Sequence, residues 1–266
     1  MSNASSEDAK LKSYYIESTH ILRRSKSQLR APLESLATAT ESLFRLHPRI
    51  LNDTIGKLFL PQQVSLFHGR ERAPLSILAH TIAVSAARIE NASCAFLDSG
   101  TNYCPALIRA LCDSKKESAE LLKRIVVGQV FGLDDVVEKV QLLYDMGNIS
   151  LIVLDSITGA LNLSGAPGSI GRQRTLFGTL DAIRRANNYL NSHVMITDHS
   201  SQDWTSGEPT PIGGNILSHA VDSVVLVDRL RQGEELVRIL IERSSSPTAA
   251  LGVIVKAGPK GIRSIR

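Results

Sequence analysis

Cysteine is scarce in this chain, and its few cysteines follow no recognisable pattern. The 266 residues include three cysteines, Cys94, Cys104 and Cys112, whose spacing suits neither a zinc site nor an even set of disulfides. Disulfide-stapled secreted domains and zinc modules are therefore excluded as classes. The simplest setting is a reducing compartment in which these cysteines are free thiols.

The chain also lacks a long apolar run. No stretch approaches the roughly 18 consecutive apolar residues that a membrane-spanning helix needs. The first residues are rich in Ser, Asn and Asp, unlike the basic and apolar start of a signal peptide. These absences predict a cytoplasmic protein that does not associate with a membrane.

Aromatic residues are few, at 5%, although 43% of all residues are hydrophobic. A core of Leu, Ile and Val is typical of parallel α/β sheets. The length suits one large domain, or one domain with a small appendage. The net charge of +4 is a mild basic excess, and it is greatest between Arg229 and Arg266. That part of the surface is the better candidate for contact with a polyanion.

Short apolar runs alternate with helical patterns from residue 64 onward. This alternation predicts an α/β fold: a mostly parallel sheet flanked by helices, with antiparallel edge strands added after the Gly/Pro-rich stretch 206–214. The expected strands are 64–67, 94–98, 124–131, 150–155, 193–197, 222–227, 236–241 and 251–256. The expected helices are 75–89, one that begins over 105–112, 134–146 and 172–189.

The N-terminal part is predicted to be helical. Pro32 suits the first turn of a helix whose leucines, the last of them Leu46, keep near-helical spacing as far as Pro48. We therefore divide the chain into a helical N-terminal segment, 1–48, and an α/β domain, 49–266.

The segment after the first expected strand has the layout of a phosphate-binding loop. A P-loop needs Gly-x-x-x-x-Gly-Lys-Ser/Thr, because amides wrap the phosphates, an ammonium reaches the β and γ groups, and a hydroxyl holds magnesium. Here Gly69 begins the frame and Ser76 ends it, but Pro74 replaces the second glycine and Leu75 the lysine. Taken alone, the segment fits an ordinary strand-to-helix connection better.

Asp155 ends the clearest buried strand of the sequence. Ligands of α/β sheets lie beyond the carboxyl ends of strands, so an acid at this point can hold magnesium or its waters. Many buried strands end in a capping aspartate, which makes the signal weak by itself. Its position after a P-loop-like segment favours the functional interpretation.

Several segments together resemble the RadA/RecA-type strand-exchange recombinases, in the order that this family has them. The stretch Pro-Ile-Gly-Gly-Asn-Ile-Leu-Ser-His-Ala at 211–220, and Arg-Ser-Ser-Ser-Pro at 243–247, are similar to the family's C-terminal signature. Residues 69–79 resemble its P-loop and following helix, and 151–157 its magnesium-binding strand. The resemblance covers residues 38–262 and implies a RecA-like ATPase core with a degenerate Walker A motif.

The departures from the family lie at its reaction centre. Leu75 replaces the lysine, and Gly100 stands where the resemblance places the glutamate that activates water. His199 stands where it places the glutamine that senses the γ-phosphate. Because the lysine and the base stabilise the transition state, we expect negligible ATP hydrolysis and assign no catalytic residue and no metal ligand. The protein is then a pseudo-ATPase.

Residual nucleotide binding stays open. Arg70 or Arg72 could supply charge from another direction, Ser76 could still meet magnesium, and amides at a helix N-terminus favour an anion. Weak binding of ATP or ADP with magnesium is the most that we expect. The degenerate nucleotide site comprises Gly69, Arg70, Arg72, Leu75, Ser76 and Asp155.

The resemblance also implies two DNA-binding loops, residues 162–171 and 200–211, whose Gly, Ser and Pro content suits loops. The residues that it implies for DNA contact are Arg172, Arg174, Trp204, Gly213 and Gly214. A tryptophan can stack on a base and an arginine can bind a phosphate. The plainer alternatives are solvated arginines at a helix start and a tryptophan that anchors its loop, and the second loop has no basic residue.

The sequence as a whole is identified as a paralog of the archaeal RadA-like recombinases. This implies a non-hydrolysing accessory factor in homologous recombination and DNA repair. The implied partners are DNA, single-stranded by preference, and a RadA-like recombinase or another paralog, in a homo- or hetero-oligomer. Two alternatives stay open: an active DNA-dependent ATPase with an unconventional nucleotide pocket, and a protein-binding scaffold without nucleic-acid contact.

Overall fold

The structure is a computed structural model that describes residues 41–202, 207, 209–231, 233–245 and 251–265. The first forty residues of the predicted helical segment lie outside this range. Residues 41–48 are not helical, contrary to the expectation of a helix that continues to Pro48. Phe44 and Leu46 are instead buried in the core of the α/β domain, where packing outweighs the helical spacing of the leucines. The division at residue 48 stays a prediction.

The described residues form a ten-stranded sheet of order β10-β9-β8-β7-β1-β5-β4-β2-β3, with β6 attached to β5. The strands are β1 (Val64–Gly69), β2 (Ser93–Asp98), β3 (Ile125–Gln129), β4 (Ile149–Asp155), β5 (His193–Gln202), β6 (Pro209–Pro211), β7 (Ser223–Arg229), β8 (Leu236–Arg243), β9 (Gly252–Gly258) and β10 (Gly261–Arg263). The helices are α2 (Arg49–Ile55), α3 (Arg72–Ala87), α4 (Pro105–Ala110), α5 (Lys115–Arg124), α6 (Leu133–Leu142), α7 (Ile157–Asn162), α8 (Ile170–Leu190) and α9 (Gly214–Ala220), with 3-10 turns η2 (Gly56–Leu58) and η3 (Leu143–Asp145).

The predicted fold class is confirmed. Strands β7, β1, β5, β4, β2 and β3 are parallel, and β8, β9 and β10 extend the sheet in antiparallel fashion. The change of direction lies between β7 and β8, so the predicted strand 222–227 belongs to the parallel part. The helix predicted over 134–146 ends at Leu142 and continues as η3.

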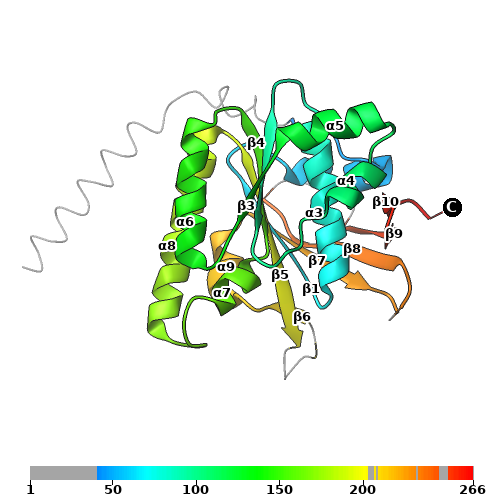
Figure 1. The fold of residues 1–266 in the computed structure, drawn as a ribbon. Helices are drawn as coiled ribbons and strands as arrows, with labels where there is room; N and C mark the ends of the chain where they lie inside the picture. The colour runs from blue at the N-terminus through cyan, green and yellow to red at the C-terminus, as the bar shows by residue number, and fades with distance from the viewer. Residues whose placement is uncertain (1–40, 203–206, 208, 232, 246–250, 266) are drawn as a thin grey trace, which may run out of the picture. The chain divides into compact units, whose positions relative to one another are not determined.

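Helices cover both faces of the sheet. Figure 1 shows α3, α4 and α5 on one side and α6 and α8 on the other. Successive residues of a strand point to opposite faces, so Phe67 of β1 joins the core under α3 and Leu66 joins the core under α8. Two hydrophobic cores thus hold the central strands, whose carboxyl ends meet at one edge of the sheet.

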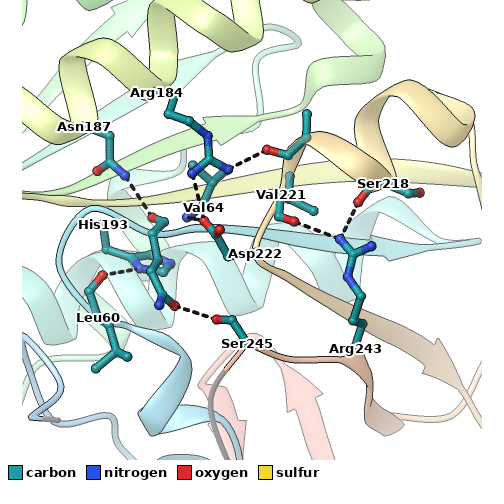
Figure 2. Close-up of polar contacts among 12 residues, drawn as sticks. Leu60, Val64, Arg184, Asn187, His193, Ser218, Val221, Asp222, Arg243 and Ser245 are labelled. Carbon is teal, nitrogen blue, oxygen red and sulfur yellow. Dashed lines mark hydrogen bonds and ion pairs between the residues drawn. The ribbon is translucent and has the colours of Figure 1, made fainter. Parts of the chain in front are cut away.

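A polar cluster at the opposite end of β1 fixes the link between α9 and β7 (Figure 2). Asp222 accepts hydrogen bonds from the backbone amide of Val64, at 2.8 Å, and from Nη1 of Arg184, at 3.3 Å. Arg243 donates to the carbonyl of Val221 at 2.8 Å. These contacts tie β1, α8, β7 and β8 together at the point where α9 ends.

Among the described residues, none of the helices combines the length and apolar character that crossing a membrane requires.

Candidate functional site

The connection from β1 to α3 is short. The strand ends at Gly69 and the helix begins at Arg72, three residues before the predicted start, so only Arg70 and Glu71 link them. A Cβ on Gly69 would lie 2.0 Å from the carbonyl oxygen of Val227. Glycine is therefore required here by the close approach of β7. The connection has no loop that could wrap phosphates in the way that the motif requires.

Leu75 lies inside the core. Its exposed fraction is 1%, and it belongs to the same hydrophobic cluster as Phe67 and Val227. Pro74, the residue in the position of the second P-loop glycine, is also buried. The two positions that would grip phosphate in a P-loop instead help to pack α3 on the sheet.

Arg72 contacts Gly100 directly. Its Nη2 donates a hydrogen bond to the Gly100 carbonyl at 2.6 Å, and a Cβ on Gly100 would lie 2.0 Å from this nitrogen. The guanidinium therefore fills the space in which a side chain at position 100 would begin. This contact joins Arg72, predicted as part of the degenerate nucleotide site, to Gly100, the position of the missing glutamate.

Asp98, at the end of β2, holds the loop that follows. Its carboxylate accepts hydrogen bonds from the amides of Gly100 at 3.0 Å, Asn102 at 2.9 Å and Tyr103 at 3.1 Å. We did not single out this residue from the sequence. The available signal was the one used for Asp155, an aspartate that ends a buried strand.

Asp155 lies where the sequence predicts it, at the carboxyl end of β4. It is 1% exposed, and Oδ1 accepts a hydrogen bond from Thr197 at 2.7 Å. Oδ2 is buried and has no hydrogen-bond partner among the described residues. Burial raises the pKa of this carboxyl above its ordinary value, and the hydroxyls of Thr197 and Ser76 and the nearby His80 only partly oppose that. An unpartnered carboxylate oxygen suits a hard cation or its water.

The magnesium–nucleotide group that the resemblance implies fits this site only in part. Asp155 offers an oxygen without a hydrogen-bond partner among the described residues, and the Ser76 hydroxyl lies near enough to act on its carboxyl. This hydroxyl also donates to the carbonyl of Asn102 at 3.5 Å, and the β1–α3 connection offers no phosphate cradle. In the part of the chain that the structure describes, no group of three or more His, Cys, Asp and Glu side chains could hold a metal ion.

His199 lies beside Arg72. Burial lowers the pKa of its half-buried ring, the positive charge of Arg72 lowers it further, and Asp155 opposes both. A cavity of about 290 Å³ opens at this point. Its lining residues are Arg72, Ser156, Thr158, Gly159, Asn162, His199 and Ile212.

The described ends of the second predicted DNA loop, 200–202 and 209–211, are paired strands, which corrects the expectation of a loop for these residues. Strand β5 continues to Gln202, and Ser200 pairs with Pro211 of β6. Buried His68 anchors the hairpin, with Nδ1 at 2.8 Å from the Ser200 hydroxyl and Nε2 at 2.8 Å from Glu242. The scattered histidines of the sequence gave no sign of this bridge.

Asp198 anchors the other side of the hairpin. It accepts hydrogen bonds from the Thr158 hydroxyl and, at 3.0 Å, from the amide of Gly213. Burial raises the pKa of Asp198 from 3.8 to about 6, and these hydrogen bonds oppose the shift. The carboxylate thus joins β5, α7 and the start of α9.

Three of the predicted DNA residues come together. Arg172, Gly213 and Gly214 line a cavity of about 430 Å³ between α7, α8 and α9. Arg172 also donates to Oδ1 of Asn162 at 3.4 Å. Arg174 is exposed on the first turn of α8, and Trp204 lies outside the described residues.

Comparison with known proteins agrees with this architecture. The family model described as Rad51 matches residues 51–262. The crystal structure of the RadB recombinase matches with a TM-score of 0.66 at 16% sequence identity, over 81% of this chain and 96% of that one, which shows a shared fold. The chain therefore belongs to the Rad51 family of recombinases, and this membership implies a role in recombination and DNA repair.

Proposed function

We propose that this protein is an accessory factor of recombination and DNA repair that does not hydrolyse ATP and acts by binding DNA, a recombinase or another paralog. The observation that carries this proposal is the start of α3 at Arg72, with Leu75 in the core. Phosphoryl transfer depends on positioning and charge stabilisation at the phosphates. A two-residue β1–α3 connection, with a buried leucine in the position of the P-loop lysine, supports a protein that does not catalyse it.

The test is an ATPase assay on the purified full chain, with and without single-stranded DNA. Asp155→Ala, purified in the same way, is the control, because it reports hydrolysis by trace contaminants. We expect the two proteins to release phosphate at the same background rate. A DNA-stimulated rate that Asp155→Ala abolishes would instead support an active ATPase with an unconventional pocket, the candidate that the unpartnered Oδ2 of Asp155 favours.

A groove at the free edge of the sheet supports binding of a protein partner. Strand β3 ends the sheet order, so its outer edge is unpaired within the described sheet. A cavity of about 380 Å³ lies beside it, between β3 and α6. Its exposed apolar side chains are Val127 at 41%, Phe131 at 71%, Leu142 at 60% and Met146 at 47%. An unpaired edge beside apolar side chains suits an extended segment that adds as a strand and anchors an apolar residue.

We propose that the segment comes from a recombinase or from another subunit of this family. Leu142→Glu should abolish co-purification with that partner from the native cell, because a charge in the groove opposes burial of an apolar anchor. Leu251→Glu is the matched control, since Leu251 is similarly exposed, at 72%, and lies outside the groove. Equal recovery of the partner with both variants would contradict this use of the groove.

A further inference from the structure

We propose that the cavity between α3, α7 and β5 binds a phosphate group through Arg72 and His199. The inference rests on the proposed function, because it names the ligand chemistry of the site that replaces a phosphate-gripping loop. Both side chains line the cavity of about 290 Å³.

Arg72 has hydrogen-bonding capacity left for a ligand. One nitrogen, Nη2, donates to Gly100 at 2.6 Å, and this bond aims the guanidinium at the cavity. Among the described residues, no acidic side chain forms an ion pair with Arg72. A guanidinium offers five N–H donors in a planar fork that matches a phosphate. The charge of Arg72 therefore remains available to an anion.

His199 supplies a second charge that depends on the ligand. The charged groups that act on its ring are Arg72 from α3 and Asp155 from β4, whereas the cavity residues from α7 are uncharged. Arg72 disfavours the imidazolium in the free protein. An anion bound between the Arg72 guanidinium and the His199 imidazole would offset this repulsion. Binding should therefore raise the pKa of His199 and favour its protonated form.

The neighbouring cavity favours a nucleic-acid backbone as the source of the phosphate. Ile212 lines both cavities, and Asn162 in the first accepts a hydrogen bond from Arg172 in the second. Arg72 and Arg172 thus lie in adjoining hollows along one edge of the sheet. A ligand with several linked phosphates can use both, whereas a single free phosphate uses one.

The experiment follows the ring resonances of His199 by NMR across pH in the full chain, with His199→Gln to assign them. The probes are inorganic phosphate, a thymidine oligonucleotide and Mg-ATP, each at constant ionic strength. We expect the probe that binds to raise the pKa of His199. A response to the oligonucleotide identifies a backbone phosphate and supports the assignment of the cavity, whereas a response to Mg-ATP alone identifies a nucleotide subsite and overturns it.

Two variants isolate the role of Arg72. Arg72→Gln should raise the pKa of His199 in the free protein and remove its response to the probes. It should also weaken oligonucleotide binding about threefold to tenfold and reduce the log–log salt slope by about one. Lys115→Gln is the matched control, because Lys115 is the exposed first residue of α5 as Arg72 is of α3.

The proposal is overturned if no probe moves the His199 resonances, or if Arg72→Gln and Lys115→Gln respond alike. Neither result depends on ATP turnover, so a failure of this inference is distinct from a failure of the proposed function. Both variants lie on exposed helix starts, and a thermal melt checks that each remains folded.

Discussion

Leu75→Lys restores the lysine of the P-loop pattern, and we expect it to destabilise the fold without creating an ATPase. Leu75 is 1% exposed among Phe67, Val227 and other apolar side chains. A lysine held there loses its charge or buries it. Keeping a lysine neutral at pH 7, against an ordinary pKa of about 10.4, costs roughly 4 to 5 kcal/mol.

Partial movement of the ammonium toward solvent would reduce this cost, so we expect a loss of about 3 to 5 kcal/mol in the free energy of unfolding. For a chain of this length, such a loss lowers Tm by about 10 °C. Urea unfolding followed by circular dichroism measures the free energy, and phosphate release measures hydrolysis. Leu75→Met is the control, because a swap of similar volume costs less than about 1.5 kcal/mol.

Two outcomes would refute the reasoning. If Leu75→Lys unfolds at the same urea concentration as the wild type, the position 75 side chain does not lie in the core. If the variant hydrolyses ATP, then the short β1–α3 connection, Gly100 and His199 do not prevent catalysis, and the loss of the lysine alone explains an inactive wild type.

Gly69→Ala should lower the free energy of unfolding by at least about 1 to 3 kcal/mol, because its Cβ would meet the Val227 carbonyl at 2.0 Å. Gly178→Ala, on α8 with open space around it, should raise stability by about 0.5 to 1 kcal/mol in the same urea assay; a similar loss at both positions would contradict the packing argument. Burial lowers the pKa of His193 from 6.5 to about 4. Between these two pH values the unfolded state binds more protons than the folded state, so the free energy of unfolding falls as the pH falls. Asp198, with its pKa raised from 3.8 to about 6, acts in the opposite direction. In urea titrations from pH 4 to 6, the free energy of unfolding should fall with rising pH in His193→Gln, because only Asp198 then titrates. It should rise with pH in Asp198→Asn, because only His193 then titrates, by about 3 kcal/mol in each case relative to the wild type. Parallel curves for all three proteins would exclude the assigned shifts.

The sequence by itself determined the order of the elements and the family. Apolar runs of strand length alternating with helical patterns specified the parallel sheet, because both faces of such strands are buried and the pattern is local. The stripe of α8 that carries Leu176, Leu180 and Ile183 is buried as its spacing predicts. Asp155 lies at the end of β4 for the same reason.

Only the tertiary structure decided what the site contains. Arg72 and Gly100 are 28 residues apart in the chain and meet because β1 and β2 end at the same edge of the sheet. His68, Ser200 and Glu242 come from three strands, and their contacts depend on register and burial rather than on spacing in the sequence. Local patterns specify which residues enter a strand or a helix, whereas the neighbours of a polar side chain depend on how distant strands pair. The sequence could therefore show that the lysine of the P-loop pattern is missing. Only the fold shows that Leu75 is buried in the core and that Arg72 donates a hydrogen bond to the Gly100 carbonyl.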